Sequence, residues 1–165
     1  MMDTKTISVG EIMRRDVRTL RDDMTVATAV AALQAARVTG APVLDGEGRC
    51  VGVFSTTDLA RRESARRPRL LDEDAMHAPV FFTFDPLSDW GDDVLTASAG
   101  TAGGDRLVDW MTRDLRVIAP SASITEACAA MLRERVHRLL VLEEGSLRGI
   151  VSAMDIVRMV ADSAG

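Results

Sequence analysis

The chain has 165 residues, of which 47% are hydrophobic and 27% charged, so it can form the core of one ordinary domain or of two small ones. This composition excludes a wholly disordered chain, and a net charge of −5 without a basic stripe disfavours a nucleic-acid partner. No apolar run approaches the roughly 20 residues of a membrane span or resembles a signal peptide, so we expect a cytoplasmic protein without a membrane partner.

The first half of the chain predicts a short helix, a strand at Val17–Leu20, a longer helix, a hairpin and a last helix. The longer helix is indicated by apolar side chains that recur at helical spacing, at Val26, Ala29, Val30 and Leu33. Two apolar runs, Ala41–Leu44 and Cys50–Phe54, flank a glycine-containing turn and predict a β-hairpin. The last helix is expected from Thr56 to about Arg66.

Residues 63–105 have no counterpart elsewhere in the chain, and we interpret them as a partly flexible insert. A connection this long is typical of a functional loop or a partly disordered segment. The apolar cluster Val80–Phe84 suggests that the first half of the insert docks on a surface. That surface is either the protein's own helices, or a partner or second subunit.

The second half of the chain repeats the pattern of the first. A strand is predicted at Leu115–Ile118, and a helix by Ile124, Ala127, Cys128 and Met131. This helix opens with Ser123-Ile-Thr-Glu126, the pattern of a capping box. A second hairpin is predicted at Leu139–Leu142 and Leu147–Val151, and a final helix at Ala153 to about Val160.

The two halves align at an offset of 98 residues. Residues 12–18 align with 110–116 and, after one residue is lost in the hairpin turn, Gly52–Asp58 align with Gly149–Asp155. One such β-α-β-β-α unit buries too little surface to be stable alone, whereas two can cover each other about a pseudo-twofold axis. We therefore divide the chain into a first domain at 1–62, the insert at 63–105 and a second domain at 106–165.

The paired units resemble a tandem pair of cystathionine-beta-synthase (CBS) domains, a Bateman module. The resemblance is carried by Glu11-Ile12-Met13, by Asp109-Trp110-Met111, by the hairpins, and by Gly-apolar-apolar-Ser-x-x-Asp at 52–58 and 149–155. It implies an α/β (α+β) fold of two pseudo-symmetric β-α-β-β-α domains packed sheet to sheet, in a stand-alone bacterial protein. It also implies a homodimer whose clefts bind AMP, ADP, ATP or S-adenosylmethionine, and which regulates an unknown partner protein.

The Ser-x-x-Asp turns carry the predicted ligand chemistry. A carboxylate where a strand ends and a helix begins can accept both hydroxyls of a ribose, as the family's Asp does. A nearby hydroxyl and the first helical N–H groups can meet a phosphate. This assigns Ser152 and Asp155 to one site, and Ser55, Thr56 and Asp58 to the other. The alternative is that both turns are plain capping boxes, in which Ser and Asp satisfy helix-end amides.

The second unit carries a further basic pair, His137-Arg138, just before a buried strand. This pair resembles the phosphate-binding His-Arg of the AMP-activated protein kinase gamma subunit, since Arg offers a permanent two-pronged charge to phosphate. The alternatives are a surface ion pair for Arg138 and an exposed strand-edge position for His137. Because the first unit has Thr39-Gly40 in this place, we expect the Asp155 site to bind phosphorylated adenosine better.

The adenine ring needs a flat apolar slot, for which Ala29 and the strand Val17–Leu20 are candidates, although both also fit the description of core residues. The sequence has no Ser/His/Asp arrangement, no metal-ligand spacing and no glycine-rich phosphate loop, so we expect no catalytic residue, metal or catalytic cofactor. The preferred interpretation is therefore a non-catalytic regulatory module that binds an adenosine-containing ligand. The alternative is a dimerisation or protein-interaction module whose ligand sites are degenerate.

Overall fold

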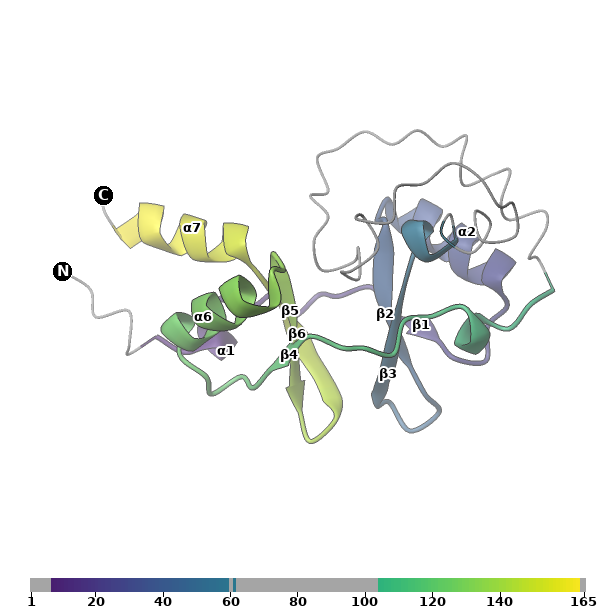
Figure 1. Cartoon of the computed structure of the whole chain (residues 1–165), viewed down its shortest axis with the longest axis horizontal. Helices are drawn as coiled ribbons and strands as arrows, with labels where there is room; N and C mark the ends of the chain where they lie inside the picture. The colour runs from purple at the N-terminus through teal and green to yellow at the C-terminus, as the bar shows by residue number, and fades with distance from the viewer. Residues whose placement is uncertain (1–6, 60, 62–103, 164–165) are drawn as a thin grey trace. The chain divides into compact units, whose positions relative to one another are not determined.

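The computed structural model describes residues 7–59, 61 and 104–163, which fall into two compact units (Figure 1). The central unit spans Arg18–Asp114, and the C-terminal unit joins the residues up to Val17 to those from Leu115 onward. Each unit has a three-stranded sheet and helices, which confirms the predicted mixed fold. The apolar cluster of the insert lies outside the described residues, so its docking stays a prediction.

The central unit is built on the sheet β1-β2-β3, in which β1 runs parallel to β2, and β2 antiparallel to β3. Its elements are β1 (Leu20–Arg21), α2 (Val26–Ala36), β2 (Gly40–Leu44), β3 (Cys50–Ser55) and the 3-10 helix η2 (Leu107–Asp109). A further helix begins at residue 56. The hairpin of β2 and β3 lies where the apolar runs predict it, with Gly40 opposite Ser55.

Helix α2 follows the predicted apolar spacing. Thr25 caps its start by accepting a hydrogen bond from the Thr28 backbone N at 3.2 Å, and Arg37 ends it in the left-handed conformation. The four apolar residues that predict the helix are all buried. They pack with Leu107, Trp110 and Met111 from the segment around η2, so this distant segment completes the core of the central unit.

The C-terminal unit repeats this plan on the sheet β4-β5-β6. Its elements are α1 (Val9–Ile12), β4 (Val117–Ile118), α6 (Ile124–Glu134), β5 (Arg138–Glu143), β6 (Ser146–Ser152) and α7 (Ala153–Ser163). Helices α6 and α7 lie next to each other and contact β5 and β6, respectively (Figure 1). The predicted hairpin and the predicted last helix are both present.

The predicted capping box of α6 is confirmed. The Ser123 side chain accepts a hydrogen bond from the Glu126 backbone N at 3.2 Å, and Glu126 accepts one from the Ser123 backbone N at 2.8 Å. The first strand is less well predicted, because β1 occupies Leu20–Arg21 and not Val17–Leu20. Leu20 is the only residue of the predicted strand that is buried, so the apolar character of Val17 is misleading.

The segment that opens each repeat packs with the hairpin of the other repeat. Arg14 exchanges two backbone hydrogen bonds with Ile150 on β6, at 2.8 and 2.9 Å. Thr112 exchanges two with Val53 on β3, at 2.8 and 2.9 Å. The compact units therefore do not coincide with the repeats, and we call residues 7–14 and 105–112 the crossing segments.

The glycine that opens each Gly-apolar-apolar-Ser-x-x-Asp motif allows the crossing segment to pack closely against the strand, because it has no side chain. A Cβ atom on Gly149 would lie 2.5 Å from the Arg14 carbonyl oxygen and 2.9 Å from the Met13 Sδ. A Cβ atom on Gly52 would lie 2.5 Å from the Met111 Sδ. Both positions require the absence of a side chain because a neighbouring segment approaches so closely.

None of the helices in the described part of the chain has both the length and the apolar character needed to cross a membrane.

Candidate functional site

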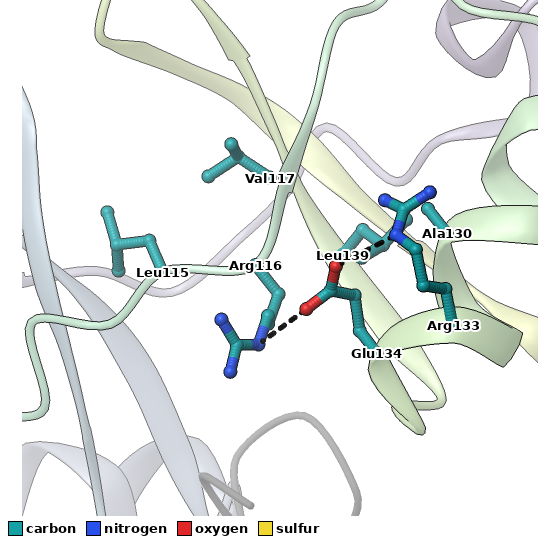
Figure 2. A pocket seen from close by; sticks show the side chains of 7 residues that line it. All are labelled: Leu115, Arg116, Val117, Ala130, Arg133, Glu134 and Leu139. Carbon is teal, nitrogen blue, oxygen red and sulfur yellow. Dashed lines mark hydrogen bonds and ion pairs between the residues drawn. The ribbon is translucent and has the colours of Figure 1, made fainter.

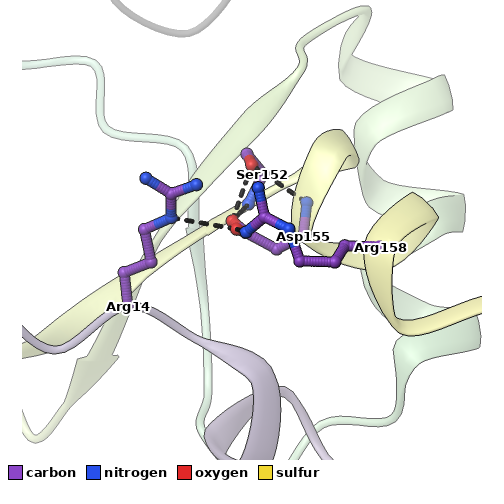
Figure 3. Close-up of polar contacts among 4 residues, drawn as sticks. All are labelled: Arg14, Ser152, Asp155 and Arg158. Atoms are coloured by element: carbon purple, nitrogen blue, oxygen red, sulfur yellow. Dashed lines mark hydrogen bonds and ion pairs between the residues drawn. The ribbon is translucent and has the colours of Figure 1, made fainter. Parts of the chain in front are cut away.

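The Ser152–Asp155 turn lies where β6 ends and α7 begins (Figure 3). One carboxylate oxygen of Asp155, Oδ2, accepts hydrogen bonds from the Ser152 backbone N at 2.9 Å and from the Ser152 Oγ at 2.6 Å. In return, the Asp155 backbone N donates to the Ser152 Oγ at 3.3 Å. The turn therefore has the reciprocal geometry of a capping box, which was the structural alternative to ligand binding.

The other oxygen of Asp155, Oδ1, is held by arginine. Arg14, from the crossing segment, donates from Nε to Oδ1 at 3.0 Å, and Arg158 of α7 places Nη1 at 3.8 Å (Figure 3). The Asp155 side chain is only 5% exposed, whereas those of Arg14 and Arg158 are 58% and 63% exposed. A buried carboxylate thus faces two guanidinium groups that are mostly in solvent.

These contacts decide the charge state of Asp155. Burial raises the pKa of the carboxyl group, but the hydrogen bonds from Ser152 and from Arg14 outweigh burial and hold the pKa below its usual value. The carboxylate is therefore ionised at neutral pH and acts only as an acceptor. This is the charge state that a ribose diol or a guanidinium group requires of it.

The central unit carries the same turn with a different partner. Asp58 Oδ2 accepts from the Ser55 backbone N at 2.8 Å and from the Ser55 Oγ at 2.7 Å. Its Oδ1 accepts a hydrogen bond from the Thr112 hydroxyl at 3.0 Å. Thr112 aligns with Arg14 at the offset of 98 residues, so the crossing segments deliver a neutral donor to one aspartate and a cation to the other.

The basic pair His137-Arg138 lies at the same end of the sheet as the Ser152–Asp155 turn. Arg138 opens β5 and stands opposite Ser152 on β6, and its side chain is half-buried. His137 is exposed, and its carbonyl oxygen accepts a hydrogen bond from the Ala153 backbone N at 2.9 Å. The register therefore brings these four predicted site residues of the C-terminal unit to one end of one sheet.

The remaining predicted residues lie in the central unit. Ser55 and Asp58 form the turn described above, and the half-buried Thr56 donates its backbone N–H to the Thr39 carbonyl oxygen at 2.9 Å. Ala29 has no exposed surface and packs in the core of that unit, so its environment is that of the core residue that the sequence also allowed. A ligand would reach Ala29 only if this core opened.

Arg14 and Thr112 were not identified from the sequence. The alignment of the repeats places them at equivalent positions, but an alignment carries no information on which hairpin each segment contacts. The structure shows that each segment pairs with the hairpin of the other repeat and that its side chain donates to the aspartate there.

A hollow of about 200 Å³ lies in the C-terminal unit between β4, β5 and α6 (Figure 2). Glu134 stands on its wall and pairs with Arg116 at 3.5 Å and with Arg133 at 3.1 Å. Its apolar lining comes from Leu115, Val117, Ala130 and Leu139. The hollow lies near the start of β5, which is the end of the sheet that holds Arg138 and Ser152.

The described residues contain no group of three or more His, Cys, Asp or Glu side chains arranged to hold a metal ion. The polar groups of the two turns are a carboxylate that accepts hydrogen bonds and a serine hydroxyl that can donate or accept them.

A family model for the CBS domain matches residues 9–65 and 107–162. The chain belongs to the CBS-domain family. Among solved structures, this CBS pair is similar to a putative acetoin utilization protein (AcuB) from Vibrio cholerae, with 21% identity, a TM-score of 0.65, and coverage of 96% of this chain and 93% of the other. It is also similar to CBSX2 in complex with AMP, with 23% identity, a TM-score of 0.66, and coverage of 97% and 100%.

Two curated relatives of the CBS pair show similar identity over most of this chain. The chloroplastic CBS domain-containing protein CBSX1 of Arabidopsis thaliana is 27% identical over 154 residues, which cover 92% of this chain and 63% of the relative. The protein MJ1225 of Methanocaldococcus jannaschii is 23% identical over 152 residues, again 92% of this chain. The chain spans 42% of the length of MJ1225, so it corresponds to one part of that longer protein.

Proposed function

We propose that this CBS pair is a non-catalytic regulatory module that binds an adenosine-containing ligand through its two Ser-x-x-Asp turns. The ligand is AMP, ADP, ATP or S-adenosylmethionine, and its binding changes how the module meets a regulated protein. The cytoplasmic location expected from the sequence stays a prediction.

The observation that carries the proposal is the second oxygen of each aspartate. In both turns Oδ2 accepts hydrogen bonds from the serine at the end of the strand, whereas Oδ1 accepts a hydrogen bond from a side chain of a crossing segment. Side-chain donors can be replaced by ribose hydroxyls without unfolding the helix cap. The half-buried Arg138 at the same end of the sheet supplies a cation suited to phosphate.

The hollow beside β4 offers room for the base. Two of its apolar residues, Leu115 and Val117, come from the segment of the second repeat that is equivalent to the predicted adenine-contacting strand Val17–Leu20. Arg116 and Arg133 on its wall can stack their planar guanidinium groups on a heteroaromatic ring. The similarity to CBSX2, whose structure was determined with AMP, supports the same class of ligand.

Isothermal titration calorimetry with the four candidate ligands tests the proposal. A hydrogen bond to a charged group contributes about 1.5–3 kcal/mol, so Asp155→Asn should weaken binding at its site by roughly 10- to 150-fold. The substitution also weakens a helix cap, so the dissociation constant is a cleaner readout than melting temperature. Asp162→Asn, an exposed carboxylate on the same helix, is the matched control. If Asp58→Asn combined with Asp155→Asn binds every ligand as the parent does, the assignment is wrong.

A second function, homodimerisation through α7, is favoured by the exposed surface of this helix. Met154, Val157 and Val160 are each 52–60% exposed and lie three residues apart on one stripe of α7. Arg158 and Asp162 flank this stripe at helical spacing. Two copies of α7 packed antiparallel would bury the stripe and bring opposite charges together, as a twofold contact requires.

Sedimentation velocity on Val157→Asp tests this second function. A buried aspartate in the seam should convert a dimer into a monomer, because the charge would lack a partner. Thr125→Asp, on the exposed first turn of α6, adds the same charge away from the stripe and should leave the dimer intact. A parent protein that sediments as a monomer at high micromolar concentration would refute the dimer.

A further inference from the structure

The two aspartate turns differ in one contact that the repeat would otherwise make equivalent. The serine contacts of Oδ2 match within 0.1 Å, at 2.9 and 2.6 Å for Asp155 and at 2.8 and 2.7 Å for Asp58. Arg158 also has a counterpart, because Arg61 occupies the equivalent position three residues after Asp58. The donor that the crossing segment supplies to Oδ1 differs, because it is Arg14 in the C-terminal unit and Thr112 in the central unit.

This difference changes what a ligand must offer. A ribose that takes Oδ1 of Asp155 displaces a charged donor and leaves the Arg14 guanidinium without its carboxylate. A phosphate on the same ligand would give Arg14 a new anion, which a guanidinium can bind with two parallel N–H groups. A ribose that takes Oδ1 of Asp58 displaces a neutral hydroxyl of the crossing segment, whose hydrogen bond water can replace.

We propose that Arg14 is the residue that makes the Asp155 site select an anionic adenosine ligand over a neutral one. This inference rests on the proposed function, and it concerns the crossing segment of the other repeat and not the predicted pair His137-Arg138. Arg14 suits this role because its side chain is 58% exposed while its backbone is fixed by two hydrogen bonds to Ile150. Its guanidinium group can therefore leave Asp155 without moving the segment.

The test compares AMP with adenosine by titration calorimetry, one site at a time. The Asp58→Asn background isolates the Asp155 site, and the Asp155→Asn background isolates the Asp58 site. In the first background, Arg14→Thr should lower the preference for AMP over adenosine about tenfold, with adenosine binding no weaker than before. In the second background, Thr112→Arg should raise the same preference.

Two further variants separate charge from shape. Arg14→Lys keeps the charge but not the planar fork, so it should retain an intermediate preference for AMP. Arg15→Thr removes a neighbouring exposed arginine whose side chain donates a hydrogen bond to the Gly10 carbonyl oxygen, and it should leave the preference unchanged. Melting curves of all variants show whether each one folds. If Arg14→Thr does not fold, the preference of Arg14→Lys for AMP over adenosine tests the inference instead.

The outcomes distinguish this inference from the proposed function. If Arg14→Thr preserves the parent preference for AMP, or weakens AMP and adenosine equally, Arg14 does not select the ligand, although the module still binds adenosine compounds. If no adenosine compound binds the parent, or if the two aspartate substitutions together leave binding unchanged, both the proposed function and this inference fall.

Discussion

Replacing Gly149 with alanine should destabilise the C-terminal unit because the new methyl group would clash with the crossing segment. Its Cβ would lie 2.5 Å from the Arg14 carbonyl oxygen, a backbone atom held by the hydrogen bond from Ile150. Relief requires the whole crossing segment to move, which also pulls Arg14 away from Asp155. Overpacking of this kind costs about 2–3 kcal/mol, the upper part of the usual range.

Gly52→Ala provides the internal comparison. There the nearest atom is the Sδ of Met111, at the flexible end of a side chain, and the nearest backbone atom is the Thr112 carbonyl oxygen at 3.1 Å. Because Met111 can adopt another rotamer, we expect a cost of only about 1 kcal/mol. Gly46→Ala, with no atom within 4 Å of the added Cβ, should be neutral or slightly stabilising.

Differential scanning calorimetry measures the three variants on one scale. For a chain of this size, 1 kcal/mol corresponds to roughly 2–4 °C in melting temperature. Gly149→Ala should therefore lower the melting temperature of the chain by about 4–12 °C, and Gly52→Ala by about 2–4 °C. Equal melting temperatures for Gly149→Ala and Gly46→Ala, or a larger loss for Gly52→Ala, would refute the argument from close approach.

Three other outcomes follow from the same contacts. Ser123→Ala removes the cap of α6 and should cost about 1 kcal/mol in urea unfolding; no change in the denaturation midpoint would contradict the cap. The folded-state pKa of Asp155 is depressed, so its stabilisation is full above the ordinary carboxyl pKa and is lost as pH falls through the lower folded value. The free energy of unfolding should therefore fall less steeply with decreasing pH below about pH 4 for Asp155→Asn than for the parent. Deletion of residues 1–16 should abolish hydrogen-exchange protection in β6 while β3 keeps its own; uniform loss would argue against separate units.

Local structure was predictable because local signals agree with tertiary packing. Three of the four apolar positions that predict α6, and all four that predict α2, are buried, and Ser123 begins its helix as the capping pattern indicates. The hairpins are predictable because two apolar runs flank a short glycine-containing turn in each repeat. The position of β1 was missed, since only two residues pair there and Val17 adds an apolar residue that is not buried.

The candidate site was only half predictable. The sequence identifies Ser152 and Asp155 because their spacing has a known hydrogen-bonding geometry. It cannot identify the partner of Oδ1, because the relevant contact joins Arg14 to a residue 141 positions away, and no periodicity records it. The same is true of Gly149. Its lack of a side chain is required because the Arg14 carbonyl oxygen approaches it closely, and the sequence does not show this approach.

The crossing segments also set the order in which a nascent chain can complete its folds. In the central unit the crossing contact, from Thr112 to Asp58, closes a loop of 54 residues, so this unit is complete once its own residues have left the ribosome. In the C-terminal unit the corresponding contact spans 141 residues, and Arg14 emerges long before β6 and α7 are synthesised. During that interval Val9 and Met13, which the finished unit buries, lack the contacts that β6 and α7 later supply to α1 and its C-terminal end. During synthesis, residues 7–14 therefore stay without their contacts to β6 and α7 until these last elements have been made.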